Sequence, residues 1–130
     1  MITVTAGILL KDSRVFIGKR KPTGRLPGKW EFPGGKVEDG ETPKESLKRE
    51  LEEELEIDAV VGDCLGENIH RYDFGTVKLL FYRVYWDGGD VSSKDHEEYG
   101  WVALDELRRY DFVPAVWPFV RRLMKGDQKK

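Results

Sequence analysis

The chain has 130 residues, of which 35% are charged and 39% are hydrophobic, and its formal net charge at pH 7 is −2. This length fits a single domain with one core, and the nearly balanced charge argues against duplex nucleic acid as a partner. No apolar run is long enough to span a membrane, and the single cysteine cannot form an internal disulfide. We therefore expect a cytoplasmic protein without a membrane partner, as a monomer or a homodimer.

The first third of the chain is predicted to form a hairpin and a glycine turn. Apolar residues predict a strand over 2–10, a tight turn over 11–14 and a partner strand over 15–19. A loop rich in Pro, Gly and basic residues, 21–29, leads through residues 30–32 to Pro33-Gly34-Gly35. Paired glycines allow the backbone to come close to a ligand.

A well-marked helix follows the glycine turn. Thr42 is suited to the N-cap, Pro43 falls at the first helical position, and Glu45 completes a capping box with Thr42. An apolar stripe at i, i+4 and i+8 should anchor the helix to a core, and it consists of Leu47, Leu51 and Leu55.

The rest of the chain is predicted to alternate strands with short helices. Long strands are expected over 59–72 and 76–86, followed by a glycine loop at 87–90 and a short strand over 99–103. A short helix over 104–109 and a closing helix over 115–124 complete the domain of residues 1–124, and residues 125–130 read as a flexible tail. This order predicts a mixed sheet with helices on both faces.

The predicted helix carries an acidic face. Glu50, Glu53 and Glu54 are related by i+3 and i+4, so they crowd one face, and Arg49 is the only cation expected near that face. Like charges on one face repel unless something neutralises them, and hard divalent cations take oxygen ligands that they share with substrate phosphates. A solvated helix with ion pairs is the usual alternative for a charge run. The adjacent glycine turn favours the metal site.

This region resembles the Nudix box of hydrolases that act on nucleoside diphosphates linked to another group. The matching positions are Gly35, Glu41, Arg49, Glu50, Leu51, Glu53, Glu54 and Ile57. The run Trp-Glu-Phe-Pro-Gly-Gly-Lys-Val-Glu over 30–38 is similar to the MutT-like branch of this family. The resemblance implies an α/β (α+β) fold, the Nudix-type α/β/α sandwich with a mixed β-sheet.

One position departs from the family pattern. Glu56 stands where the family usually has glycine, which ends the helix in a left-handed conformation. That conformation costs a residue with a Cβ about 1–2 kcal/mol. We therefore expect the helix to end differently around residues 55–57.

The resemblance also implies which groups hold the metal, Mg²⁺ with Mn²⁺ as a substitute. The Gly34 carbonyl, Glu53 and Glu54 would be ligands. Glu50 would activate or position water, although the division between base and ligand varies within the family, so that Glu50 is also a candidate ligand.

Two further residues of the box are implied to support the catalytic groups. Glu41 and Arg49 would orient the acidic residues without being ligands themselves. In the implied reaction, the cation neutralises charge on phosphate oxygens and lowers the pKa of a water, and a carboxylate accepts its proton.

A second acidic group, residues 95–98, lies shortly before Trp101. MutT-like proteins often carry an acid and a histidine at this distance before a tryptophan, and the acid contributes to metal binding. Asp95 matches this position, with Glu98 or Glu97 as substitutes because aspartate has a shorter reach; a solvated acidic loop is the alternative. His96 is expected to be a hydrogen-bonding residue, since hard cations prefer oxygen.

Substrate-binding residues are suggested on both sides of the glycine turn. Basic residues there suit a polyphosphate tail, and the resemblance selects Arg20 and Lys36. Phe32 is one candidate for stacking on a base. Residues 112–116 resemble the base-reading segment of MutT-like enzymes, in which Asn or Asp commonly takes the place of Val116. Because a valine side chain cannot hydrogen bond to a base, this departure argues against a specialist for oxidised guanine or cytosine.

The resemblance implies Mg²⁺-dependent hydrolysis of nucleoside triphosphates to monophosphate and pyrophosphate, with a small nucleotide as the substrate. Oxidised or modified dNTPs are an alternative, and so is another nucleoside-diphosphate-X compound such as a dinucleotide or sugar nucleotide. A nucleotide-sensing domain without turnover is a third reading, disfavoured because the acidic residues of the box are present. A plain acidic interaction module does not explain the glycine turn.

Overall fold

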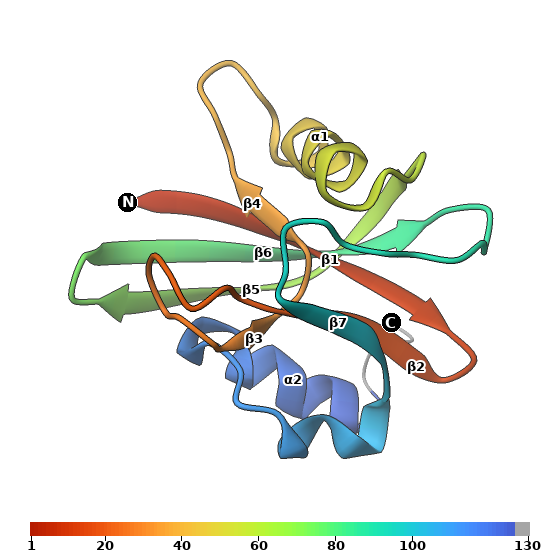
Figure 1. Ribbon diagram of the computed structural model, residues 1–130. Coiled ribbons are helices and arrows are strands. Elements are labelled where there is room, and N and C mark those ends of the chain that lie inside the picture. The colour runs from red at the N-terminus through yellow and green to blue at the C-terminus, as the bar shows by residue number, and fades with distance from the viewer. Residues whose placement is uncertain (127–130) are drawn as a thin grey trace.

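A computed structural model describes residues 1–126 of the chain. Figure 1 shows a twisted sheet with one helix, α1 (Pro43–Leu55), on one side and α2 (Trp117–Met124) on the other. The predicted mixed α+β fold, with a sheet covered on both faces, is therefore confirmed.

Within residues 1–126 the sheet has seven strands. They are β1 (Ile2–Lys11), β2 (Arg14–Lys19), β3 (Trp30–Glu31), β4 (Gly34–Lys36), β5 (Val60–Tyr72), β6 (Gly75–Tyr85) and β7 (Glu98–Ala103). The order is β3-β2-β1-β6-β5, while β4 pairs with β1 and β7 pairs with β2. The sheet is mixed because β1 and β6 run parallel, whereas the other pairs are antiparallel.

The start and packing of α1 agree with the sequence. The Glu45 N–H donates to Thr42 Oγ1 at 3.2 Å, and the Thr42 N–H donates to Glu45 Oε1 at 2.9 Å, which completes the capping box. The leucine stripe is buried, and it packs on the face of the sheet that carries Leu80, Tyr82 and Val84. The helix is thus anchored along one side, and its opposite side is left for polar residues.

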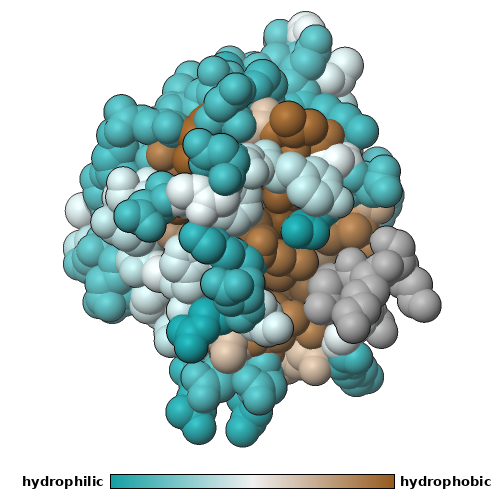
Figure 2. Space-filling view, turned by 90° about the vertical axis from the view of Figure 1, so that its right-hand side faces the viewer, coloured by the Kyte–Doolittle hydropathy of each residue, from teal (hydrophilic) through white to brown (hydrophobic). Residues whose placement is uncertain are grey.

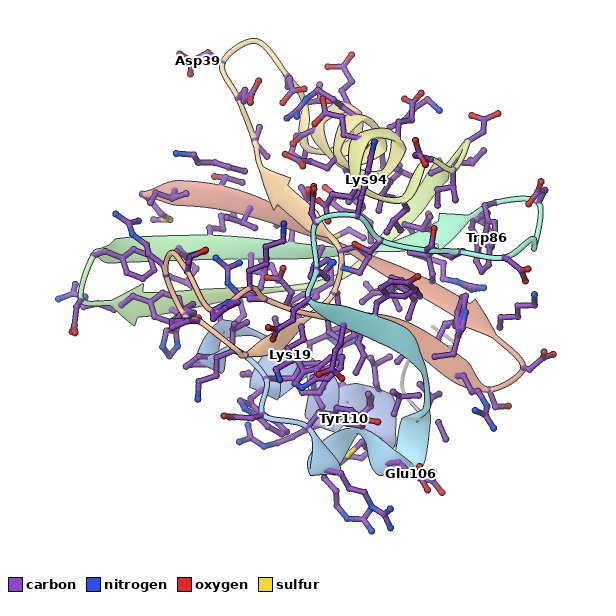
Figure 3. The ribbon with its side chains drawn as sticks, viewed as in Figure 1. Lys19, Asp39, Trp86, Lys94, Glu106 and Tyr110 are labelled. Carbon is purple, nitrogen blue, oxygen red and sulfur yellow. The ribbon has the colours of Figure 1, made fainter. Side chains whose placement is uncertain are left out.

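The prediction that α1 ends differently from the family pattern is wrong. Glu56 adopts the left-handed conformation, with φ 57° and ψ 37°, as a glycine would. Its N–H donates to the Glu52 carbonyl at 3.1 Å, and the Lys94 N–H donates to the Glu54 carbonyl at 3.3 Å. Because these bonds satisfy carbonyls of the last turn, they offset the cost of the left-handed backbone. Lys94 also lies 3.4 Å from the Glu56 carboxylate, beside α1 (Figure 3).

The closing helix differs in part from the prediction. It begins as a short 3-10 turn, η2 (Pro114–Val116), before α2. Pro118 has no N–H to donate to the Pro114 carbonyl, and the Trp117 N–H donates there instead, in the 3-10 pattern. The predicted short helix over 104–109 is likewise a 3-10 helix, η1 (Leu104–Arg109).

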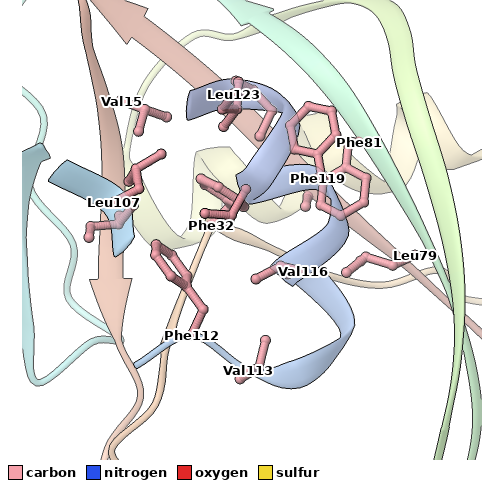
Figure 4. Packing of buried hydrophobic residues seen from close by; sticks show 14 of the residues in the cluster. Val15, Phe32, Leu79, Phe81, Leu107, Phe112, Val113, Val116, Phe119 and Leu123 are labelled. Carbon is pink, nitrogen blue, oxygen red and sulfur yellow. The ribbon is translucent and has the colours of Figure 1, made fainter. Parts of the chain in front are cut away.

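Alternating residues of β6 divide the core between the two faces of the sheet. Leu79 and Phe81 face α2, where they join Phe32, Val116 and Phe119 in the larger cluster, shown in Figure 4. The smaller cluster lies under α1. On the face shown in Figure 2, apolar residues emerge in a strip among hydrophilic ones.

The end of the described chain continues the last turn of α2. The Lys125 N–H donates to the Arg121 and Arg122 carbonyls at 3.2 and 3.1 Å. Residues 127–130 of the predicted tail lie outside the described residues. Among residues 1–126, no helix is long and apolar enough to cross a membrane.

Candidate active site

Two cavities share a wall at the glycine turn. The first, of about 290 Å³, is lined mainly by apolar residues, and we call it the apolar cavity. The second, of about 280 Å³, we call the acidic cavity, and its charged lining residues are Arg20, Lys21, Glu31, Glu54 and Asp95. Arg20, Glu31 and Gly34 line both. The apolar cavity and the acidic cavity are therefore adjacent.

The glycine turn admits close contact at two points. Gly34 has φ 153° and pairs with Ala6 of β1, and a Cβ at this position would overlap the carbonyl oxygen of Thr5. A Cβ on Gly35 would overlap the carboxylate of Glu50. Packing therefore requires glycine at Gly34, where the overlap is with the backbone of β1, whereas a Cβ at Gly35 would displace the Glu50 carboxylate from the β4 backbone.

Arg49 joins the acidic residues of the box into one network. Its Nε and Nη2 donate to Glu41 Oε2 and Oε1 at 2.6 and 2.9 Å, a bidentate pair. This hydrogen bonding lowers the pKa of Glu41 to about 2. The Nη1 of Arg49 lies 3.3 Å from Glu50 Oε2 and 3.4 Å from Glu53 Oε1. Arg49 is therefore placed to orient the carboxylates of the helix.

The carboxylates on α1 differ sharply in their surroundings. The Glu53 side chain is 61% exposed, whereas the residue Glu54 is only 6% exposed and lines the acidic cavity. Burial, followed by the negative charges of Glu31 and Glu50, raises the pKa of Glu54 to about 9. Burial also raises the pKa of Glu50, against the opposing charge of Arg49. Without a bound cation, Glu54 therefore keeps a proton at neutral pH.

This protonation gives a test of the electrostatics at Glu54. Its folded-state pKa of about 9 exceeds the ordinary 4.5, so the folded state binds one more proton between these values. We expect the unfolding free energy of metal-free protein to fall as the pH rises through this window, by at most about 1.4 kcal/mol per pH unit from this group. Urea unfolding in EDTA from pH 5 to 9 measures the slope.

Glu54→Gln should flatten this slope, because the amide does not titrate. Glu52→Gln, a change at an exposed neighbour, is the matched control and should leave the slope intact. Equal slopes in all three proteins would contradict the assignment to Glu54. Added Mg²⁺ should recover stability mainly at the alkaline end, where it competes with fewer protons.

Of the second acidic group, the structure brings only Asp95 into the acidic cavity. Glu97 and Glu98 lie 3.7 and 3.5 Å from Lys19 Nζ, and the Glu98 side chain is 62% exposed. Glu98 begins β7 directly opposite Lys19 of β2, and this register keeps it away from Glu54. The structure therefore does not bring the proposed substitute ligands to the helix carboxylates.

His96 has the predicted hydrogen-bonding role. Its Nδ1 lies 2.7 Å from Ser93 Oγ, and its Nε2 lies 2.9 Å from Glu31 Oε2. Both ring nitrogens are engaged and the side chain is buried, so His96 ties the loop that carries Asp95 to strand β3.

The four proposed substrate-binding residues, Arg20, Phe32, Lys36 and Val116, all line the apolar cavity. Phe32 and Val116 are almost fully buried and belong to the core cluster of Figure 4, so they form its inner wall. Arg20 is held at the boundary between the cavities, where its Nη1 donates to Glu31 Oε1 at 2.9 Å. Asp39, by contrast, lies at the tip of the loop between β4 and α1 (Figure 3).

The sequence did not single out Glu31, which lines both cavities. Glu31 contacts both Arg20 and His96. Its only signal was a charge between two aromatic residues of a short strand. In the lining of the apolar cavity, the Tyr72 and Phe74 rings stack with their centres 4.9 Å apart, and the Arg25 guanidinium lies 4.2 Å from the centre of the Phe74 ring. The contact between Arg25 and Phe74 joins two loops far apart in the sequence, and no local pattern predicts it.

The residues present suit a hard divalent cation. Within the described residues, no three His, Cys, Asp or Glu side chains gather closely enough to enclose a metal ion. Glu50 and Glu53 are engaged by Arg49. The available donors around Glu54 are nevertheless all oxygens, and burial among like charges makes its carboxylate costly to ionise alone. Positive charge supplied there would relieve this repulsion, and oxygen donors are the ligands that Mg²⁺ and Mn²⁺ accept.

Comparisons with known proteins agree with this geometry. Residues 1–123 match the family model of the NUDIX domain. A Mycobacterium tuberculosis protein provisionally named 8-oxo-dGTP diphosphatase 2 is 42% identical over 115 residues, which cover 86% of this chain and 80% of that protein. The Escherichia coli CTP pyrophosphohydrolase is 32% identical over 124 residues, which cover 95% of this chain and 92% of that enzyme.

A solved structure shows the same fold. The crystal structure of a MutT protein from Methanosarcina mazei matches with a TM-score of 0.87 at 27% identity, and the match covers 97% of this chain and 94% of that one. The family match extends over nearly the whole described chain, and the helix that carries the acidic residues lies within it. This chain therefore belongs to the Nudix hydrolase family, in its MutT-like branch.

Proposed function

We propose that this protein hydrolyses nucleoside triphosphates to nucleoside monophosphate and pyrophosphate, with Mg²⁺ or Mn²⁺ as its cofactor. The observation that carries this proposal is the shared wall between the apolar and acidic cavities. A base fits the first cavity, and the phosphates pass Gly34 into the second. A nucleotide carries a base for the apolar cavity and, joined to it through the sugar, phosphates for the acidic cavity.

The size of the apolar cavity supports a single nucleoside. Its volume of about 290 Å³ lies at the small end of small-molecule sites, which begin near 300 Å³. It therefore suits one base and sugar better than both halves of a dinucleotide. The second base, or the sugar of a sugar nucleotide, would have to lie outside it.

The polyphosphate meets charges of both signs. Arg20 and Lys36 line the apolar cavity near the glycine turn, and Lys21 lines the acidic one, so all three are placed to contact phosphate oxygens. We assign metal binding to Glu53, Glu54, Asp95 and the Gly34 carbonyl, with Glu50 able to join them. The bound cation supplies charge neutralisation and a water of lowered pKa.

Glu50 is the group that we assign to accept the proton of the attacking water. Its carboxylate packs against Gly35 and is held by Arg49, so its position is restrained from two sides. Partial burial raises its pKa toward the range that suits a general base. Glu41 holds the other edge of the Arg49 guanidinium and so fixes Arg49 for this task.

A nucleotide panel tests the proposal. Purified protein with Mg²⁺ is incubated with the common NTPs and dNTPs, 8-oxo-dGTP, a dinucleoside polyphosphate and a sugar nucleotide. We expect monophosphate and pyrophosphate in equal amounts from triphosphates, and EDTA should stop their release. Absence of product from every compound, or release of inorganic phosphate alone, would contradict the proposal. Tight nucleotide binding without product would favour a sensing domain.

Oxidised guanine nucleotides are a second candidate substrate. The support is the relative provisionally named 8-oxo-dGTP diphosphatase 2, whereas another relative is named for CTP. The Val116 side chain offers no hydrogen bond to either base. Relative kcat/KM values for 8-oxo-dGTP, dGTP and CTP in the same panel separate these candidates.

A further inference from the structure

Two hydrogen bonds between distant segments lie beside the apolar cavity. The Ala115 N–H donates to the Tyr72 hydroxyl oxygen at 2.9 Å, and Asn68 Nδ2 donates to the Ala115 carbonyl at 2.8 Å. Both partners lie on β5, whereas Ala115 lies in the 3-10 turn before α2. Tyr72 and Ala115, the two residues that the first of these bonds joins, both line the cavity.

The polar groups next to the Tyr72 hydroxyl are already hydrogen bonded. Thr5 Oγ1 donates to the Gly35 carbonyl at 3.3 Å, and the Ala115 N–H is taken by Tyr72. Val116 has no polar side-chain atom. The Tyr72 oxygen, however, accepts in its bond to Ala115, so its own proton is left over. In the part of the chain that the structure describes, no hydrogen bond from the Tyr72 hydroxyl is found.

This hydroxyl proton is retained at neutral pH. Partial burial raises the pKa of Tyr72 above its ordinary value, so the group stays a donor. The stacked Phe74 ring and the bond from Ala115 restrain the tyrosine from two directions. Apart from its basic side chains, the cavity therefore offers a ligand the restrained Tyr72 hydroxyl as a donor within mainly apolar walls.

We propose that Tyr72 determines base specificity by donating a hydrogen bond to a carbonyl oxygen of the base. This inference rests on the proposed function and narrows its substrate class to nucleotides with a keto base. An amino group at the same position of the base would leave the hydroxyl proton without an acceptor in an apolar site, and unpaired buried polar groups oppose binding. Tyr72 thus supplies the hydrogen bond to the base that the Val116 side chain cannot form.

The test uses nucleotide pairs that differ in this keto or amino group and in the proton on the adjacent ring nitrogen. The kcat/KM values are compared for dITP against dATP, and for dUTP against dCTP. We expect the keto member of each pair to be preferred by the wild type, and Tyr72→Phe to reduce the preference by about three- to tenfold, the range of one neutral hydrogen bond. Tyr99→Phe, at an exposed tyrosine, is the matched control and should keep the wild-type ratio.

A second variant separates recognition from support of the wall. Asn68→Ala removes the bond to the Ala115 carbonyl but leaves the Tyr72 hydroxyl in place. Asn68→Ala should lower kcat/KM for keto and amino nucleotides alike and leave the ratio of the two values unchanged. If Asn68→Ala alters the ratio as much as Tyr72→Phe, the wall rather than the hydroxyl sets the preference, and the inference is overturned.

Binding measurements keep this test independent of catalysis. Dissociation constants for dIMP and dAMP are measured by calorimetry with wild type and Tyr72→Phe. A preference for dIMP that Tyr72→Phe reduces supports the inference even if no triphosphate is hydrolysed, a result that would defeat only the proposed function. No preference in the wild type, or an equal preference in both proteins, overturns the inference.

Discussion

Glu53→Gln is expected to lower kcat by about 10²- to 10⁴-fold while leaving the melting temperature nearly unchanged. The substitution removes one negative charge from the face of α1 that we assign to the metal. Stability should not suffer, because the side chain is 61% exposed and its pair with Arg49, at 3.4 Å, is a surface ion pair worth at most about 1 kcal/mol. Steady-state kinetics over a range of Mg²⁺ concentrations measure the loss.

Glu52→Gln is the matched control for this experiment. Glu52 is the exposed residue just before Glu53, and it projects about 100° around the helix from it. Its replacement removes the same charge without touching the assigned face and should leave kcat unchanged. If Glu53→Gln keeps more than half of the wild-type turnover at saturating Mg²⁺, Glu53 is not part of the catalytic centre.

Gly34→Ala is expected to destabilise the fold by about 3 kcal/mol or more. Two costs combine here, because φ is 153° and the new Cβ would overlap the Thr5 carbonyl oxygen on the neighbouring strand. Relief of the overlap would separate β4 from β1, which pair through Gly34 and Ala6. Urea unfolding measures the change in free energy, and the wall between the cavities should be lost with it.

Gly40→Ala isolates the backbone cost from the overlap. Gly40 also has a positive φ, 85°, but no atom lies within 4 Å of a Cβ built there. We expect this variant to lose only about 1–2 kcal/mol. Equal losses in the two variants would show that the overlap with Thr5 contributes nothing at Gly34.

Local patterns in the sequence predicted the elements of this protein well. The capping box at Thr42 and Glu45 and the leucine stripe depend on residues three to four positions apart, so the sequence contains the whole interaction. The same holds for the turn at Asp12 and Ser13, whose φ angles of 53° and 63° suit a tight hairpin. At the end of α1, where the distant residue Lys94 takes part, the prediction from local sequence was wrong, because Glu56 adopts the left-handed conformation.

The candidate site shows the same division between what local sequence predicts and what contacts with distant segments decide. The spacing of Glu50, Glu53 and Glu54 placed them on one side of a helix, but it did not distinguish the buried carboxylate from the exposed one. That difference arises because the loop carrying Asp95 packs against the end of α1, where the Lys94 N–H reaches the Glu54 carbonyl at 3.3 Å. Burial is a property of the packed chain, so the raised pKa of Glu54 follows from the fold.

The sequence by itself determined the family motif, the acidic helix, the glycine turn beside it and the mixed arrangement of strands and helices. These features depend on periodicity and on short-range hydrogen bonds, which are local. Only the tertiary structure decided which acid joins Glu54, where Glu31 lies, and that Tyr72 reaches Ala115 across 43 residues. Such contacts depend on strand register and on the packing of distant loops, and neither is encoded within a single stretch of sequence.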